Sequence, residues 1–224
     1  MELYILPMPL ASEATYWLYP QWEAVVQRLE HFFVERAARV RGLLERRGKS
    51  PSACLYEYDS QLQDWRWEAY EAVFGQRYPA ALLSEAGLPG VADPGHTVVR
   101  RAHAEGYQVI PLAGPSSITL ALAASGLKGQ CFAFRGYPPL PSKERRRFLQ
   151  EVFQSAYHTT QILMETPGRT NQLLEEILRL GPPDLLLCVA HHLTAPTAFI
   201  QTRPIALWSV TPLPKGPTLF LLGK

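Results

Sequence analysis

The sequence is poor in the features that mark secreted, metal-binding and membrane-spanning proteins. It has three cysteines, Cys54, Cys131 and Cys188, which are odd in number and form no C-x-x-C pair. This spacing argues against a disulfide framework and a zinc ribbon, and it suits a reducing cytoplasm. No stretch approaches the roughly 20 uninterrupted apolar residues of a transmembrane helix, and the short apolar start is not a signal peptide. We therefore expect a cytoplasmic protein without a metal or a membrane association.

The chain also has little net charge. Its 22 Lys and Arg residues against 20 Asp and Glu leave a formal charge of +2. Its overall field therefore does not attract nucleic acid, and a nucleic-acid role needs a local basic patch. The 224 residues are 47% hydrophobic, which is enough to bury a core and excludes disorder as the main state. At roughly 150 residues per domain, this length allows one large domain or two small ones.

The first half of the chain alternates between strand and helix patterns. From Ala80 to Gly126 the order is strand, helix, strand, helix, which predicts a parallel sheet with right-handed crossovers and helices on its faces. The predicted strands of this half are 3–6, 31–34, 53–58, 80–84 and 107–112, and the predicted helices are 21–30, 36–47, 61–74, 96–105 and 116–125.

The second half predicts another α/β domain, with more strand and an antiparallel end. Its predicted strands are 131–134, 159–165, 184–190, 197–201, 205–210 and 218–222, and its predicted helices are 142–156 and 171–180. The pattern resets after two glycine-containing loops, so we expect two α/β domains, residues 1–114 and 115–224.

Two consecutive strand-to-helix loops are rich in glycine and proline: Ser84–Gly95 and Ala113–Ser117. Glycine lets a ligand approach the backbone, and a helix start offers free N–H donors. In a parallel sheet both loops lie at the carboxyl ends of strands, where ligands bind. Either loop alone can be a simple turn, but the pair predicts the floor of a pocket.

Other motifs are missing or ambiguous. The chain has no G-x-G-x-x-G after its first strand, no G-x-x-x-x-G-K-[ST] and no G-x-S-x-G, which removes the main support for dinucleotide, nucleoside-triphosphate and hydrolase functions. His191 and His192 are neighbours, and because adjacent side chains on a strand point to opposite faces, they are poor joint ligands for a metal. A basic cluster can clamp phosphates or be the solvated face of an amphipathic helix: Lys143, Arg145, Arg146 and Arg147.

The segment LSEAGLPGVADPG and the later string PLAGPSS resemble the central motifs of the tetrapyrrole-methylase-like enzymes, which depend on S-adenosylmethionine. The opening LYILPMPL, the segment METPGR and the closing GPTLFLLGK resemble further blocks of that family, so the likeness touches both halves of the chain. The resemblance implies two α/β domains with the cofactor in the cleft between them, and a homodimer. The S-E-A-G-x-P form resembles the ribosomal-RNA-methylating branch.

By motif position, the resemblance also implies which residues face the cofactor. In the first half they are Pro7, Ser84, Glu85, Ala86, Gly87, Pro89, Gly114, Pro115, Ser116 and Ser117, and in the second half they are Met164, Glu165, Pro217 and Thr218. Glu85 or Glu165 can accept hydrogen bonds from a ribose hydroxyl or from the amino group.

The implied reaction is an in-line transfer of a methyl group from sulfur to a nucleophile, which requires alignment rather than a metal. If the acceptor is a ribose 2′ hydroxyl of ribosomal RNA, Glu35 is a candidate base, although a carboxylate in that position can simply cap the following helix. The basic cluster at 143–147 would then bind RNA.

Two alternatives stay open. The acceptor can be a tetrapyrrole or another small molecule, or the chain can bind S-adenosylmethionine without turnover. The second alternative is motivated by the loop after the first strand, which has Ala11 and Ser12 where the family usually has glycine. A separate departure from the family pattern is Glu85, which replaces the commoner aspartate.

Overall fold

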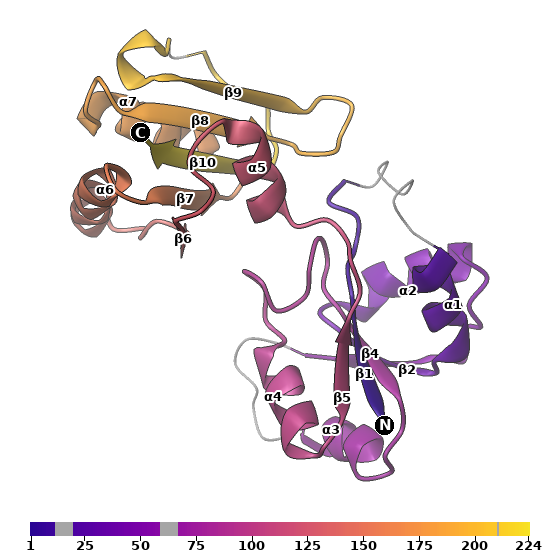
Figure 1. Cartoon of the computed structure of the whole chain (residues 1–224). Coiled ribbons are helices and arrows are strands. Elements are labelled where there is room, and N and C mark those ends of the chain that lie inside the picture. Colours follow the sequence, from indigo (N-terminus) through magenta and orange to yellow (C-terminus); the bar gives the residue numbers. More distant parts are fainter. Residues whose placement is uncertain (12–19, 59–66, 210) are drawn as a thin grey trace. The chain divides into compact units, whose positions relative to one another are not determined.

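The computed structural model describes residues 1–11, 20–58, 67–209 and 211–224, which fold into two compact units (Figure 1). Unit 1 is Met1–Ser116 and unit 2 is Ser117–Lys224. The sequence placed this boundary two residues earlier, after Gly114. Each unit contains a five-stranded sheet, so the predicted α/β class with two sheets is confirmed.

Unit 1 contains one parallel sheet with strand order β3-β2-β4-β1-β5. All five of these strands were predicted, with ends within two residues of those observed. The strands are β1 (Glu2–Leu6), β2 (His31–Val34), β3 (Cys54–Glu57), β4 (Ala80–Leu83) and β5 (Gln108–Pro111), and the helices are α1 (Pro20–Arg28), α2 (Ala37–Arg46), α3 (Trp67–Phe74) and α4 (His96–Ala104).

Helices cover both faces of this sheet because successive strand residues point to opposite sides. Leu6 and Phe32 pack with α1 and α2 on one face. Ile5 and Phe33 pack with α3 and α4 on the other. Figure 1 shows the two helix pairs on either side of the strands. Because these five strands are parallel, their carboxyl ends all lie at one edge of the sheet.

Unit 2 contains a mixed sheet with strand order β6-β7-β10-β8-β9, in which only β6 and β7 are parallel. The predicted antiparallel end is therefore present. The strands are β6 (Phe132–Gly136), β7 (Thr160–Glu165), β8 (Leu186–His191), β9 (Phe199–Pro204) and β10 (Thr218–Gly223), and the helices are α5 (Ser117–Ser125), α6 (Ser142–Ala156), α7 (Thr170–Leu180) and the 3₁₀ helix η2 (Ile205–Leu207).

The main core of unit 2 forms where α6 and α7 pack on one face of the sheet. Leu149 and Ile177 from these helices meet Val189 and Phe220 from β8 and β10. The apolar helix α5 belongs to the same unit, and the carbonyl of its last residue accepts a hydrogen bond of 2.6 Å from Thr202 on β9. Because β10 is the central strand of the sheet, its first residue, Thr218, lies between Glu165 on β7 and His191 on β8.

Two sequence predictions differ from the structure or reach beyond it. The predicted strand at 205–210 is wrong: Ile205 begins η2, and its N–H donates to the carbonyl of Leu185 at 2.9 Å, so the buried Ile205 side chain joins the core from a helical turn. The first six residues of the predicted helix 61–74 lie outside the described residues, and α3 begins at Trp67. In the described parts of the chain, no helix is both long enough and apolar enough to cross a membrane.

Candidate functional site

The loops after β1 and β4 are fastened together at the carboxyl edge of the unit 1 sheet. β1 and β4 are neighbours, with Leu6 opposite Leu83. Just beyond them, the N–H of Met8 donates to the carbonyl of Gly87 at 2.7 Å, and the N–H of Gly87 donates to the carbonyl of Met8 at 3.0 Å. This pair of hydrogen bonds holds Pro7 and the predicted segment 84–87 side by side.

Gly87 is the point at which a third loop joins them. Its φ of +74° is in the left-handed region, which disfavours residues with a Cβ. A Cβ on Gly87 would lie 3.2 Å from Cδ2 of Leu10 and 3.8 Å from the carbonyl oxygen of Pro115. The loops after β1, β4 and β5 therefore meet around a backbone position that must stay small. This is the kind of position that lets a ligand contact main-chain groups.

A hollow of about 610 Å³ opens beside these loops, which is within the usual size range of small-molecule sites. One wall is the loop after β1, another is α2, and the third is the segment after β4. The lining residues are Met8, Pro9, Leu10, Ala11, Arg39, Val40, Leu43, Arg46, Arg47, Glu85 and Ala86. Apolar side chains and main-chain groups of two loops can hold the adenine and methionine parts of the implied cofactor, and Glu85 is the acidic residue of a lining that also contains Arg39, Arg46 and Arg47.

Glu85, predicted to face the cofactor, is engaged by two arginines of the α2 region. Its Oε1 lies 2.9 Å from Nε of Arg36, and its Oε2 pairs with Arg39. Both arginine side chains are mostly exposed, whereas the glutamate side chain is only 21% exposed. A ligand that hydrogen-bonds to Glu85 therefore has to share this carboxylate with a double ion pair.

Glu35, the candidate base, follows β2 and faces the same edge. Its Oε2 accepts a hydrogen bond of 3.3 Å from the N–H of Glu85. The helix-cap explanation for Glu35 is wrong, because the N–H of Ala37 at the start of α2 donates instead to Oε1 of Glu57 at 2.7 Å. Within the described residues, Oε1 of Glu35 makes no hydrogen bond.

Two residues that the sequence did not point to stand beside Glu35. Burial is the main cause that raises the pKa of Asp93 to about 6, and the nearby carboxylates of Glu35 and Glu85 add to it. Burial and the same carboxylates raise the pKa of Tyr58, whose hydroxyl donates to the carbonyl of Leu83 at 2.9 Å. Asp93 lies in the glycine loop that the sequence singled out, but Tyr58 carried no signal because it belongs to a strand end distant in sequence.

In unit 2, the predicted residues gather at one end of the sheet. Thr218 at the start of β10 lies opposite Glu165 at the end of β7, and Leu219 lies opposite Met164. Glu165 is 1% exposed, and its Oε1 accepts from the N–H of Thr166 at 2.7 Å and from Nη2 of Arg169 at 2.6 Å. This carboxylate fixes its own loop, and its predicted contact with a cofactor stays a prediction.

His191 is a further residue at this end of the unit 2 sheet that the sequence did not assign. It lies opposite Thr218, is 1% exposed, and places Nδ1 2.8 Å from Oγ1 of Thr218. Burial, and then the neighbouring His192, lowers the pKa of His191, which favours the uncharged ring. Thr218 also donates to the carbonyl of Gly216 at 3.2 Å, which makes its oxygen the acceptor for Nδ1–H.

The basic cluster on α6 is not uniformly exposed. Arg145 is only 4% exposed and binds Glu176 on α7 through two hydrogen bonds, from Nε and from Nη2, each of 2.7 Å. The prediction that Arg145 forms part of an accessible RNA-binding patch is therefore wrong, because its guanidinium is buried between two helices. Lys143, Arg146 and Arg147 are exposed, and their contact with substrate stays a prediction.

Some predictions are left open by this geometry. Pro89 is buried in the loop after β4, Gly114 and Ser116 precede the unit boundary, Ser117 begins α5, and Pro217 is exposed just before β10. Their contacts with a cofactor, and its position between the two domains, stay predictions. Among the described residues, no group of three or more His, Cys, Asp or Glu side chains is arranged to hold a metal ion.

Known proteins resemble this chain in sequence. The sequence model of one protein family, the tetrapyrrole (corrin/porphyrin) methylases, matches residues 22–206 of this chain. A Vibrio cholerae protein named ribosomal RNA small subunit methyltransferase I is 36% identical over 126 residues, which cover 56% of this chain and 43% of that protein. The Escherichia coli O157:H7 protein of the same name is 29% identical over 204 residues, which cover 91% of this chain and 69% of that protein. This chain thus spans less than half of the first relative.

Solved structures resemble it in fold. The crystal structure of the methyltransferase CobJ has a TM-score of 0.65 at 16% identity, covering 99% of this chain and 93% of that one. A uroporphyrin-III-C-methyltransferase from Thermus thermophilus has a TM-score of 0.58 at 18% identity, covering 100% of this chain and 94% of that one. At these identities the likeness concerns the fold.

Proposed function

Because the chain belongs to the tetrapyrrole methylase family, we propose that it is an S-adenosylmethionine-dependent methyltransferase that acts on RNA, at a ribose 2′ hydroxyl of ribosomal RNA. The observation that carries this proposal is the meeting of three strand-end loops around Gly87, where Met8 and Gly87 exchange two main-chain hydrogen bonds. The names of the sequence relatives support RNA as the acceptor class.

Main-chain groups of the three loops would hold the cofactor, through Pro7, the segment 84–87 with Pro89, and the segment 114–117. Met164, Glu165, Pro217 and Thr218 would contribute from unit 2. When bound, S-adenosylmethionine supplies a methyl group on a positively charged sulfur. Carbonyl oxygens and carboxylates tolerate such a charge, and Glu35 and Asp93 supply carboxylates near Glu85, which is paired with Arg36 and Arg39.

A ribose hydroxyl must lose its proton as it takes the methyl group. Glu35 would accept that proton at its unbonded Oε1, while the N–H of Glu85 holds Oε2 in place. The raised pKa of Asp93, about 6, also suits a group that exchanges protons near neutral pH, since a base works best when its pKa is close to the working pH. For this methyl transfer the protein then has to align the two reactants and provide one group that accepts the proton.

A binding module without turnover is the second candidate. It is motivated by the loop after β1, which has Ala11 and Ser12 where the family usually has glycine. The two candidates agree on cofactor binding and differ only on methyl transfer.

The first experiment is a thermal-shift titration of the purified protein with S-adenosylmethionine and S-adenosylhomocysteine, with NAD and ATP as controls. At about 100 times its dissociation constant a ligand adds about 2.7 kcal/mol, which raises the melting temperature by roughly five to ten degrees in a chain of this size. A shift with NAD or ATP and none with the sulfur nucleosides would contradict the proposal.

The second experiment offers radiolabelled S-adenosylmethionine with small-subunit ribosomal RNA, with small ribosomal subunits, and with a tetrapyrrole. Label in the RNA is expected. Label only in the tetrapyrrole would move the acceptor to a small molecule, and binding without any transfer would support the module.

The proposal also includes a homodimer in the cytoplasm. Three unpaired thiols, Cys54, Cys131 and Cys188, agree with a reducing compartment. Light scattering coupled to gel filtration tests the dimer directly, because it measures the mass of the particle against the 25.2 kDa of one chain.

A further inference from the structure

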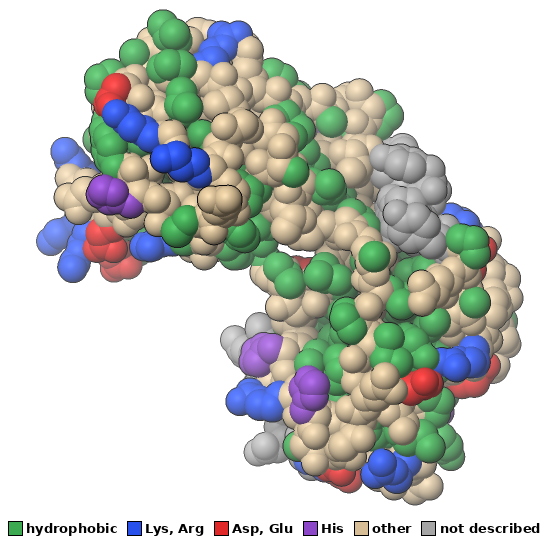
Figure 2. Space-filling model, in the orientation of Figure 1, with side chains coloured by type: hydrophobic (Ala, Val, Ile, Leu, Met, Phe, Trp, Pro, Cys, Tyr) green, Lys and Arg blue, Asp and Glu red, His purple; other side chains and the backbone are tan. Residues whose placement is uncertain are grey.

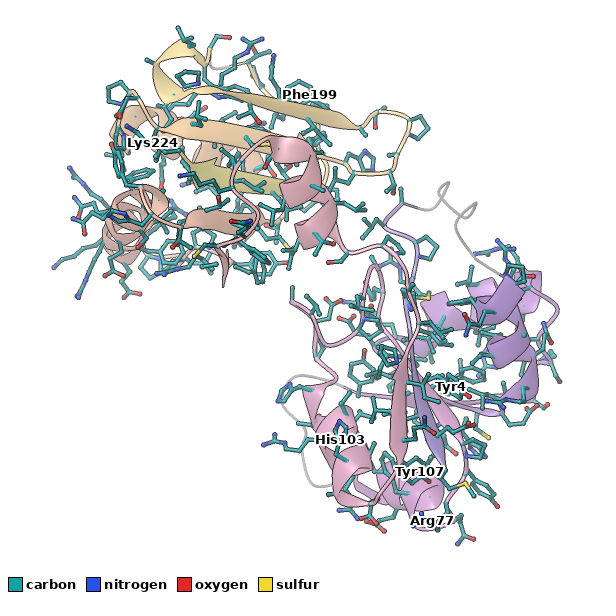
Figure 3. The ribbon with its side chains drawn as sticks, in the orientation of Figure 1. Tyr4, Arg77, His103, Tyr107, Phe199 and Lys224 are labelled. Carbon is teal, nitrogen blue, oxygen red and sulfur yellow. The ribbon has the colours of Figure 1, made fainter. Side chains whose placement is uncertain are left out.

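A second hollow in unit 1 is lined by a row of basic side chains on α4. His96, Arg100 and His103 are spaced four and then three residues apart, so they lie on one face of the helix, about 6 Å and then 4.5 Å apart along its axis. All three side chains are exposed. The opposite face of α4 packs Val98 and Ala102 into the core, so the basic face is turned outward. Figure 3 labels His103 on this helix.

The floor of this hollow is apolar. It has a volume of about 510 Å³ and lies beside β5, the edge strand of the sheet, and under the loop after β4. The lining residues other than the basic row are Ile5, Leu88, Pro89, Gly90, Val99 and Pro111. Figure 2 shows histidine and basic side chains beside apolar surface on unit 1. A flat apolar group with a negatively charged end matches this combination of floor and rim.

Within the described residues, no carboxylate pairs with this basic row. The adjacent Arg101 is a useful contrast, because its Nη2 lies 2.8 Å from Oε1 of Glu71 and 2.7 Å from Oε1 of Glu105. Arg100 has no ion pair within the described residues, and no Asp or Glu of that part of the chain lines the hollow. Since unpaired arginines beside an apolar surface suit phosphate-containing ligands, the hollow is complementary to an anion rather than to a cation.

We infer that this hollow binds one nucleotide of a single-stranded RNA, with the phosphate on the basic row and the base on the apolar floor. The inference deepens the proposed function, on which it rests for the choice of RNA. Single-stranded RNA is typically bound by cations that follow the backbone and by planar side chains on which unstacked bases stack; in this hollow the base would contact an aliphatic floor. Pro89 belongs both to the floor and to the loop of Gly87, so a strand held here passes the candidate cofactor loop.

The test compares binding of a short fluorescent single-stranded RNA to the full chain and to a triple variant, His96→Gln with Arg100→Gln and His103→Gln. Fluorescence anisotropy without cofactor measures the dissociation constant at several salt concentrations. We expect affinity to fall about tenfold. The slope of log K against log salt should become shallower by about 0.7 for each phosphate that the variant no longer neutralises.

A matched control is Arg179→Gln. Arg179 is exposed, ends a helix in unit 2, and lines a partly apolar hollow of about 400 Å³, but Glu175 lines the same hollow. The substitution removes one arginine charge, as Arg100→Gln does, but from a hollow that also holds a carboxylate, so the RNA affinity should change less than twofold.

Three results would overturn the inference: no RNA binding by the native protein, equal affinity of the native protein and the triple variant, or an equal loss of affinity in the Arg179→Gln control. A free nucleoside monophosphate that binds as tightly as the RNA would overturn the assignment to a polynucleotide. The thermal shift with S-adenosylmethionine reports separately on the proposed function, so a protein that shifts with the cofactor but fails these tests loses only the RNA site.

Discussion

Replacing Arg145 with alanine should destabilise unit 2, although the sequence placed this residue in a surface patch. Its guanidinium makes two hydrogen bonds of 2.7 Å with Glu176, and the side chains are only 5% and 16% exposed. Removing one partner of a buried ion pair leaves the other charge without compensation, which costs about 3–5 kcal/mol. Because Glu176 keeps some exposure to solvent, we expect a decrease of about 3 kcal/mol in the free energy of unfolding.

Urea unfolding followed by circular dichroism measures this decrease. With a denaturant dependence of about 2 kcal/mol per molar, 3 kcal/mol moves the midpoint of the unit 2 transition down by about 1.5 M. The control is Arg146→Ala, one residue along the same helix but exposed, which should change stability by less than about 0.5 kcal/mol.

A paired replacement separates the ion pair from the space it fills. Arg145→Met combined with Glu176→Leu removes both charges and keeps most of the volume, so stability should return to within about 1 kcal/mol of the native protein. If Arg145→Ala and Arg146→Ala unfold at the same urea concentration, the reasoning is refuted, and Arg145 returns to the set of residues available to RNA.

Three further predictions follow from unit 1 and from the cysteines. Gly87→Val should abolish the thermal shift with S-adenosylmethionine, because its added carbons meet Leu10 at a left-handed φ; Gly90→Ala, also at a left-handed φ of +80° but with open space around it, should keep the shift. Asp93→Asn should stabilise the protein by about 1–2 kcal/mol at pH 7, measured by urea titration. The folded pKa of Asp93 is raised to about 6, so its stability contribution is present below about pH 4 and is lost as the pH rises through 6. A gain in stability that is equal at pH 4 and pH 7 would contradict this reasoning. Cys188 is buried with a raised pKa, so a thiol reagent should modify the two exposed cysteines in the native protein and reach Cys188 only after unfolding, as counted by mass spectrometry.

The ion pairs of Glu85 with Arg36 and Arg39 respond differently to anionic and to cationic ligands. Arg36 and Arg39 are exposed and both contact Glu85, so an anionic ligand at this edge competes with the glutamate for the same cations. A cationic sulfur nucleoside instead competes with the arginines for the glutamate. The salt dependence of cofactor binding therefore reports whether the ligand displaces Glu85 from the arginines or displaces the arginines from Glu85.

The sequence alone was sufficient for most of the secondary structure and for the loops. Alternation of strand and helix patterns predicted every strand of unit 1 that the structure describes. The three inner strands β1, β2 and β4 are buried and carry strong apolar runs, and the partly exposed edge strands β3 and β5 were found from the helix patterns around them. The glycine-rich segment 84–95 was recognisable because glycine and proline act on the backbone locally. Local signals of this kind require no knowledge of distant parts of the chain.

Partners between residues distant in sequence were decided by the tertiary structure. Arg145 looks like its neighbours in sequence, but the packing of α6 on α7 buries it against Glu176. The cap of α2 comes from Glu57 rather than from Glu35, because the parallel pairing of β2 with β3 places both carboxylates at one edge. A side chain's burial and charge partners depend on which elements pack together, and a one-dimensional pattern holds that information only for neighbours.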